Sequence, residues 1–313
     1  MTPAAPGSRL HVALAGLSLH NPLFLAAGTA GYGRELDAVM DLDALGGLVT
    51  KAVSLESRAG APAPRVTEFA SGMLNAVGLA NPGVEAVRPP HLPWLAARLT
   101  QAKVLVNVVG ESPEQFAAVV ERLQGLPGVH GFELNVSCPN VKAGGMEFGA
   151  DPAALVEVVR LARAATRQPL FVKLSPTVSD IARTAAVALE AGADGLTLVN
   201  TMPGLLIDVE RRRPILGFGN GGMSGGALLP VGVLATRKVY AATRAPIIGV
   251  GGIGGATDAL QYLLAGASAF AIGTAALRDP RLPQRVVADL ASWCEVRGVE
   301  SISSLTGALE WPT

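Results

Sequence analysis

The sequence contains few cysteines, and this scarcity bounds where the protein works. Only Cys138 and Cys294 occur among the 313 residues. Two cysteines cannot supply the disulfide framework of a small secreted protein, so a reducing cytoplasm fits best. Aromatic residues make up 4% and charged residues 16%, whereas 50% of the chain is hydrophobic. A chain of this balance can bury a large core, and intrinsic disorder is not expected.

The chain also lacks an excess of charge of either sign, because Lys+Arg and Asp+Glu number 25 each. We therefore expect neither a nucleic-acid partner nor an anionic membrane surface. No uninterrupted apolar run reaches the length of a membrane span. The weakly apolar N-terminal stretch is broken by Gly16 and His20 and has no convincing cleavage site. These absences predict a cytoplasmic enzyme without a membrane anchor.

Histidine is scarce as well, and its placement argues against two kinds of chemistry. The four histidines are His11, His20, His91 and His130. None follows a predicted strand, and none has metal-ligand spacing to another. The sequence contains no GxSxG nucleophile elbow. We therefore expect no metal site and no hydrolase triad.

What the sequence does contain is an alternation of short apolar runs with helical segments. The runs are nearly continuous in apolar residues, which is typical of strands covered on both faces. The predicted strands span 22–28, 46–53, 103–110, 131–138, 169–175, 195–200, 246–252 and 269–274. The predicted helices span 112–125, 151–166, 179–195, 256–269 and 282–297. This order predicts an α/β fold, a (β/α)8 TIM barrel. The alternative, an open doubly wound sheet, is disfavoured because no early GxGxxG follows a first strand.

The remaining segments fit around one barrel. We expect residues 1–313 to form a single domain, since no linker, repeat or low-complexity tract interrupts the pattern. Residues 8–20 are predicted to form a hairpin that closes the barrel bottom. The segments 54–93 and 201–229 are too long for plain connections and are rich in Gly, Pro and Asn. Long loops of this kind in a compact domain are usually functional.

Polar residues gather where the predicted strands end, which is where TIM barrels carry their chemistry. Lysines lie at 51 and 173, and asparagines at 107, 135 and 200. Any one of these residues could be a surface lysine or an asparagine that caps a turn. Such structural roles do not readily explain why all five lie at strand ends. Glycine-rich strings at 249–255 and 273–275 follow strands seven and eight, the usual place for a phosphate. The segment 220–226 adds another glycine-rich backbone surface.

This combination of lysines, asparagines, a thiol and glycines suits an organic cofactor that carries the redox step. A non-redox barrel, with Lys173 forming a Schiff base and the glycines holding a phosphorylated sugar, remains an alternative. Cys294 lies in an apolar helix and is expected in the core. Cys138 follows a strand and precedes Pro139 and a glycine-rich loop, so it is either a core residue or a thiol facing a substrate.

Several stretches, in this order along the chain, resemble the dihydroorotate dehydrogenases. They include "GGLVTKAVSLESRAGAPAPRV", "MLNAVGLANPGVE", "NVSCPNVKAGG", "LVNT", "GGMSGGALLPVGV", "PIIGVGGI" and "LLAGASAFAIGTA". The resemblance runs from about residue 10 to 295. It implies oxidation of dihydroorotate to orotate in pyrimidine biosynthesis, with a hydride passing to one FMN per chain and a proton to Cys138 as the catalytic base.

The resemblance also assigns binding roles to individual residues. It implies that FMN is held by Ala27, Lys51, Ala52, Asn107, Asn135, Lys173, Val199, Gly225, Gly251, Gly252, Gly273 and Thr274. It implies that the substrate is bound by Lys51, Asn75, Ala76, Val77, Gly78, Leu79, Asn135, Asn200 and Thr201. Ala27 departs from the family, which often has serine there. We expect Thr29 or backbone groups to supply the missing hydrogen bond.

The resemblance further implies a subclass and partners. A cysteine at 138 and the absence of a membrane segment indicate class 1, and "NAVGLANPGVE" is similar to the NAD-linked class 1B type. That type implies a homodimer within a heterotetramer, whose second subunit carries FAD and a [2Fe–2S] cluster. Two cysteines are too few for a cluster in this chain. A fumarate-using class 1A enzyme and a dihydropyrimidine dehydrogenase-like flavin barrel remain the alternatives.

Overall fold

The computed structural model describes residues 9–137, 139–140 and 146–312. Eight parallel strands close into a barrel in the order β11-β12-β17-β18-β3-β4-β7-β8. They are β3 (Leu23–Leu25), β4 (Gly47–Val49), β7 (Lys103–Val108), β8 (Gly131–Asn135), β11 (Leu170–Leu174), β12 (Gly195–Leu198), β17 (Ile247–Val250) and β18 (Ala269–Ile272). This confirms the predicted TIM barrel and all eight predicted strands. Each strand ends at or before the predicted residue. The polar residues predicted at the strand ends therefore lie either in the last residues of a strand or in the loop that follows it.

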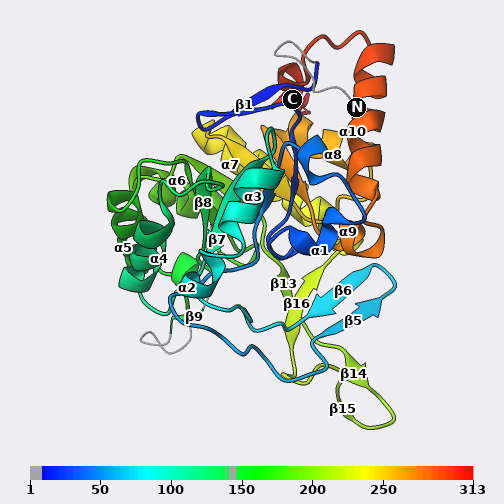
Figure 1. Cartoon of the computed structure of the whole chain (residues 1–313). Coiled ribbons are helices and arrows are strands. Elements are labelled where there is room, and N and C mark those ends of the chain that lie inside the picture. Colours follow the sequence, from blue (N-terminus) through cyan, green and yellow to red (C-terminus); the bar gives the residue numbers. More distant parts are fainter. Residues whose placement is uncertain (1–8, 138, 141–145, 313) are drawn as a thin grey trace.

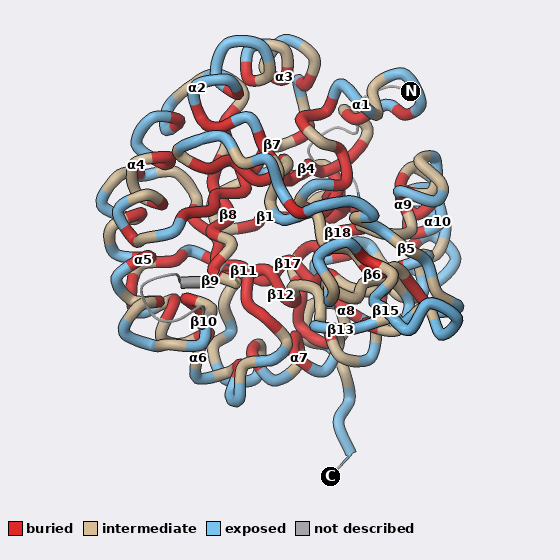
Figure 2. Tube along the Cα trace, turned by 90° about the horizontal axis from the view of Figure 1, so that it is seen from below, coloured by how far each residue is buried: buried red, intermediate tan, exposed pale blue. Residues whose placement is uncertain are grey.

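Helices surround the barrel, and the buried strands occupy its centre (Figures 1 and 2). The five predicted helices correspond to α4 (Pro113–Leu123), α5 (Pro152–Ala164), α6 (Ile181–Glu190), α8 (Ala256–Ala265) and α10 (Leu282–Val296). Five more are α1 (Arg34–Asp37), α2 (Val84–Val87), α3 (Leu92–Arg98), α7 (Leu229–Thr243) and α9 (Thr274–Arg278). Proline lies in the first turn of α4, α5 and α7, where its missing N–H costs nothing. Asp151 caps α5 by accepting a bond from the Ala153 N–H.

The two ends of the barrel are covered differently (Figure 1). The predicted N-terminal hairpin is present as β1 (Val12–Leu14) and β2 (Leu17–Leu19), and its Leu14 and Leu19 are fully buried. At the opposite end a four-stranded antiparallel sheet has the order β13-β16-β6-β5. Its strands are β5 (Val66–Phe69), β6 (Gly72–Asn75), β13 (Met202–Gly204) and β16 (Gly221–Ser224). We call it the cover sheet; it joins the two long insertions predicted at 54–93 and 201–229.

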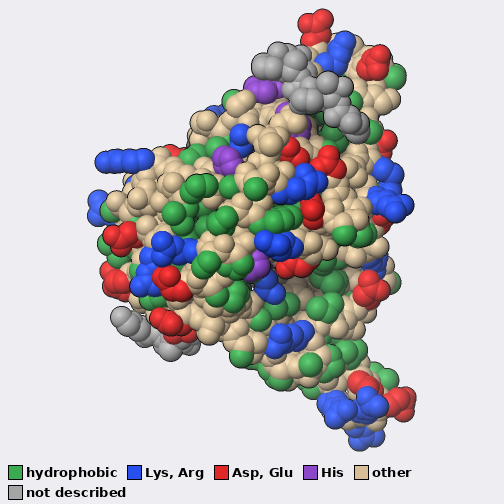
Figure 3. All heavy atoms as spheres, viewed as in Figure 1, with side chains coloured by type: hydrophobic (Ala, Val, Ile, Leu, Met, Phe, Trp, Pro, Cys, Tyr) green, Lys and Arg blue, Asp and Glu red, His purple; other side chains and the backbone are tan. Residues whose placement is uncertain are grey.

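Two short strand pairs complete the structure. One pairs β9 (Pro139–Asn140) with β10 (Met146–Glu147), directly after the fourth barrel strand. The other, β14 (Ile207–Asp208) with β15 (Arg213–Pro214), forms a hairpin that projects beyond the cover sheet (Figure 1). Basic side chains gather at its tip, whereas both signs of charge are mixed over the rest of the visible face (Figure 3). Among the described helices, none has the length and apolar character needed to cross a membrane.

The core lies inside the barrel and between the barrel and its helices. Phe24, Phe132, Phe171 and Phe270, on four different barrel strands, are completely buried. Cys294 on α10 is also fully buried, which confirms its predicted place in the core. Such close packing makes the strand ends a rigid base for whatever binds above them.

Candidate active site

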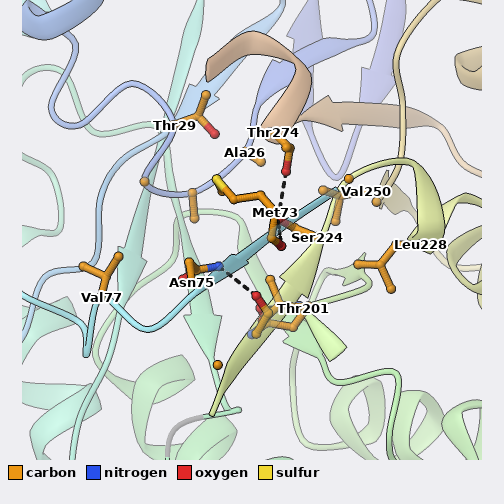
Figure 4. Close-up of a pocket in the computed structure, with 18 of the residues that line it drawn as sticks. Ala26, Thr29, Met73, Asn75, Val77, Thr201, Ser224, Leu228, Val250 and Thr274 are labelled. Carbon is orange, nitrogen blue, oxygen red and sulfur yellow. Dashed lines mark hydrogen bonds between the residues drawn. The ribbon is translucent and has the colours of Figure 1, made fainter. Parts of the chain in front are cut away.

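A cavity of about 1180 Å³ lies between the C-terminal ends of the barrel strands and the cover sheet. Figure 4 shows side chains from both layers, such as Ala26 and Val250 from the barrel and Met73 and Asn75 from the cover sheet, turned toward the same space. Small-molecule sites usually have volumes of roughly 300–1,000 Å³. This cavity therefore has room for more than one ring system.

The cavity brings together the residues that the sequence predicted for a cofactor and a substrate. With one exception, every one of them lies in its lining: Ala27, Lys51, Ala52, Asn75, Ala76, Val77, Gly78, Leu79, Asn107, Asn135, Lys173, Val199, Asn200, Thr201, Gly225, Gly251, Gly252, Gly273 and Thr274. The exception is Cys138, which lies outside the described residues. Its sequence neighbour Ser137 also lines the cavity.

Two lysines supply positive charge, and their surroundings differ. Lys51 follows β4, and its backbone N–H donates to the Gly31 carbonyl at 2.8 Å. Within the described part of the chain, no carboxylate lies within 4.0 Å of its ammonium group. Lys173, on β11, is 7% exposed, and its Nζ lies 3.9 Å from Glu133 Oε1. Of these two lysines, Lys51 has no counter-charge among the described residues, whereas Lys173 is partly balanced by Glu133.

Three asparagines offer their amides at fixed orientations. Asn200 Nδ2 donates to Asn135 Oδ1 at 3.1 Å, and Asn200 Oδ1 accepts from the Thr201 N–H at 2.8 Å. Asn75 Nδ2 donates to the Gly222 carbonyl at 3.1 Å (Figure 4). Among the described residues, these bonds leave the Asn135 amide N–H groups and the Asn75 Oδ1 for a ligand. A ligand with alternating donors and acceptors would match them.

Glycines let the backbone form one wall of the cavity. Gly225, Gly251 and Gly252 have φ of 95°, 125° and 76°, a region that favours glycine. A Cβ on Gly252 would collide with the backbone nitrogen of Leu229, at the start of α7. The wall therefore needs glycine at 252 for both its conformation and its close packing.

The structure adds site residues that sequence reasoning missed. Glu147 lines the cavity, and burial raises the pKa of its carboxyl, partly offset by a hydrogen bond with Ser175. Ser224 lines it too, and accepts a hydrogen bond from Thr274 Oγ1 at 2.8 Å (Figure 4). Glu133 lies beneath the cavity in β8. Its charge within an apolar run was a signal in the sequence, whereas Glu147 and Ser224 carried none.

Comparison with known proteins gives a consistent result. The family model described as dihydroorotate dehydrogenase matches residues 9–293. The chain is 50% identical over 297 residues to "Dihydroorotate dehydrogenase B (NAD(+)), catalytic subunit" of Desulforudis audaxviator, covering 95% of this chain and 96% of the relative. The proteins of the same name from Pelobacter propionicus and Geobacter sp. (strain M21) are 48% and 46% identical, each covering 96% of this chain and 98% of the relative.

Proposed function

Because the chain belongs to the dihydroorotate dehydrogenase family, we propose that it oxidises dihydroorotate to orotate as the catalytic subunit of an NAD-linked, class 1B enzyme of pyrimidine biosynthesis. One observation carries the proposal. The predicted cofactor and substrate residues that are described all line one cavity at the mouth of the barrel. We propose that residues 1–313 form one FMN-binding barrel domain.

The residues present fit FMN. The glycine wall at 251–252 and 273 permits close approach of a phosphate to backbone N–H groups, and Lys173 supplies a positive charge nearby. Ala27 cannot donate a side-chain hydrogen bond, but the Thr29 hydroxyl lines the same cavity. When bound, FMN supplies the acceptor for the hydride that leaves the substrate. The twelve residues assigned to the flavin above would hold it.

The substrate side of the cavity fits a pyrimidine acid. Lys51 has no competing carboxylate among the described residues and is assigned to the substrate carboxylate. Asn75, Asn135 and Asn200 are assigned to the N–H and C=O edges of the ring, which amides match with one donor and one acceptor group each. Residues Ala76–Leu79 and Thr201 line the same cavity and are assigned to the substrate as well.

Cys138 is proposed as the base that takes the proton from C5 of dihydroorotate. A thiol has an ordinary pKa of about 8.5, and a lysine charge near it would favour the thiolate, so turnover should rise toward mildly alkaline pH. Cys138→Ala is expected to keep bound FMN and lose most turnover. Cys138→Ser with full turnover at neutral pH would refute this assignment, and loss of flavin from Cys138→Ala would indicate a structural role instead.

The test of the function starts from the colour of the purified protein. We expect a yellow protein whose flavin is bleached by dihydroorotate under anaerobic conditions. Dihydrouracil and dihydrothymine, which lack the carboxylate, should fail to bleach it. A colourless protein that cannot take up FMN would refute the proposal and favour the non-redox barrel. Bleaching by dihydrouracil in place of dihydroorotate would favour the dihydropyrimidine dehydrogenase-like alternative.

The partner follows from the NAD-linked assignment. The relatives are named as catalytic subunits, which implies a second polypeptide. We propose a homodimer of this chain within a heterotetramer, whose other subunit carries FAD and a [2Fe–2S] cluster. Purification from the native cell should yield an iron–sulfur flavoprotein together with this chain. Rapid oxidation of the reduced chain by fumarate, without any partner, would instead support the class 1A alternative.

A further inference from the structure

A buried carboxylate lies directly below the proposed flavin site, and the roles assigned above do not use it. Glu133 on β8 is 1% exposed. Its Oε1 accepts a hydrogen bond from Asn107 Nδ2 at 2.7 Å and lies 3.9 Å from Lys173 Nζ. Within the described part of the chain, it is the only carboxylate that pairs with Lys173. Both of its partners line the cavity, whereas Glu133 does not.

The strand register explains why the three side chains meet. Asn107 pairs with Glu133 across β7 and β8. Lys173 on β11 pairs with Asn135, two residues beyond Glu133 on β8, so its side chain lies on the same face as that of Glu133. Directly paired residues of adjacent strands point to the same face of a sheet, which here is the inside of the barrel. The carboxylate therefore belongs to the interior layers that support the cavity floor.

The charge of Glu133 determines which way the Asn107 amide faces. An ionised carboxylate can only accept hydrogen bonds, so Asn107 must present its NH₂ group to Glu133. Its Oδ1 is then available to the cavity as an acceptor, and it has no other side-chain partner among the described residues. A neutral glutamine at 133 could donate as well as accept, and would permit the amide to turn over.

The same carboxylate also limits the positive charge that Lys173 presents to the cavity. A unit negative charge a few ångströms from an ammonium group in a buried site offsets much of its field. Glu133 Oε2 has no hydrogen-bond partner in the described structure. Buried carboxylate oxygens that serve folding alone are normally satisfied, so the half-satisfied state of this group calls for another explanation.

We propose that Glu133 is a positioning residue that fixes the Asn107 acceptor and offsets the Lys173 charge, and thereby sets the reduction potential and the affinity of the flavin. The inference rests on the proposed function, since it needs a flavin in the cavity. Adding electrons to a flavin adds negative charge, which the Lys173 ammonium would stabilise. Removing the opposing carboxylate should therefore make the flavin easier to reduce.

The test measures the flavin potential of wild type, Glu133→Gln, Glu133→Asp and Thr197→Val by equilibration with reference dyes. Glu133→Gln should raise the ratio of reduced to oxidised flavin at fixed potential at least tenfold, about 30 mV for a two-electron couple. Glu133→Asp keeps the charge but withdraws it by one methylene. It should leave that ratio within threefold and weaken FMN binding to the apoprotein about tenfold, measured by fluorescence quenching.

Thr197→Val is the matched control. Thr197 pairs with Lys173 across β11 and β12, is 2% exposed and has an unpartnered hydroxyl, so the change is buried, isosteric and neutral. Its potential should equal that of wild type. A Glu133→Gln potential that is unchanged or lower would overturn the charge role. If that variant fails to fold, Glu133→Asp decides, because FMN affinity equal to wild type would overturn the positioning role. A wild-type protein that binds no FMN would instead refute the proposed function itself.

Discussion

Replacing Gly252 with alanine tests how closely the backbone wall of the cavity is built. Gly252 follows β17 with φ of 76°, and its neighbour in space is the first residue of α7, Leu229. An added Cβ would collide with the Leu229 backbone nitrogen and lie 2.7 Å from its Cα. Both are backbone atoms, so no side-chain rotation relieves the contact.

The cost follows from two independent terms. An alanine in the left-handed region costs about 1–2 kcal/mol relative to glycine. Overpacking of a rigid site adds about 1–3 kcal/mol. Gly255, three residues later, is the matched control: its φ is −174°, an extended conformation open to any residue, and nothing lies within 4 Å of an added Cβ. Gly255 is also the N-cap of α8, where alanine is less favourable than glycine. This offsets the gain from restricting the unfolded chain, so alanine there should change the stability by less than about 1 kcal/mol.

Urea denaturation of both variants measures the free energy of unfolding, and flavin titration of the apoprotein measures the affinity of the site. We expect Gly252→Ala to be less stable than Gly255→Ala by about 2–5 kcal/mol, the sum of the two costs. We also expect it to bind FMN at least tenfold more weakly, because the loop that would accommodate the methyl group forms the cavity wall. Equal stability and equal FMN affinity of the two variants would refute the packing argument.

Three further predictions concern charged groups. Lys51→Gln should weaken orotate binding about 10–100-fold, since a hydrogen bond to a charged group contributes about 1.5–3 kcal/mol; flavin absorbance titration measures this, and unchanged affinity would remove Lys51 from the carboxylate site. Asp43 is partly desolvated, which alone would raise its pKa, but bonds from Thr100, Gln101 and Ala102 outweigh this and lower it. Its ionised form therefore stabilises the fold above its unfolded pKa, and Asp43→Ala should cost about 2–4 kcal/mol at pH 7. That cost should shrink as the pH falls through the lowered pKa of Asp43. A difference in Tm between wild type and Asp43→Ala that stays constant across this pH range would contradict the prediction. Burial raises the pKa of Glu147 in the folded state. The folded state then holds the proton more tightly than the unfolded chain does, so the stability falls as the pH rises from the unfolded pKa to the folded pKa of Glu147. The Tm of Glu147→Gln should match the wild-type Tm near pH 4 and exceed it near pH 8. If the Tm of the variant differs from that of wild type by the same amount at both pH values, the burial effect is refuted.

The barrel could be predicted from the sequence because its signal is local. Strands covered on both faces need runs such as Leu170–Leu174, in which all five residues are buried. Lys173 stands out in such a run, and so does Lys51 two residues after Val49. Parallel strands in a barrel all deliver their C-terminal ends to one mouth, so these residues could be expected to meet without any knowledge of their contacts.

The cover sheet could not be predicted because its pairing is not local. Gly221–Ser224 contains two glycines and is intermediate in burial throughout, so neither an apolar run nor alternation marks it as a strand. Asn75 pairs with Gly222, 147 residues away, and nothing near either residue specifies the other. Helix α7 was missed for a different reason: Leu229–Thr243 follows a glycine-rich stretch, and its apolar face is weakly marked. Only Pro230 in its first turn pointed to a helix start.

The proposed cofactor and substrate contacts are divided between the two layers of the site. Most residues assigned to the flavin follow barrel strands, where buried neighbours hold them rigidly. Asn75 to Leu79 and Thr201 lie in the cover sheet or its connections, which are half-exposed and are joined to the barrel by contacts such as Thr274 to Ser224. A flavin potential requires fixed charges, whereas a substrate must enter and leave. The barrel strands therefore suit the first requirement and the two insertions suit the second, and substitutions within Asn75–Leu79 can change the substrate without removing a residue assigned to the cofactor.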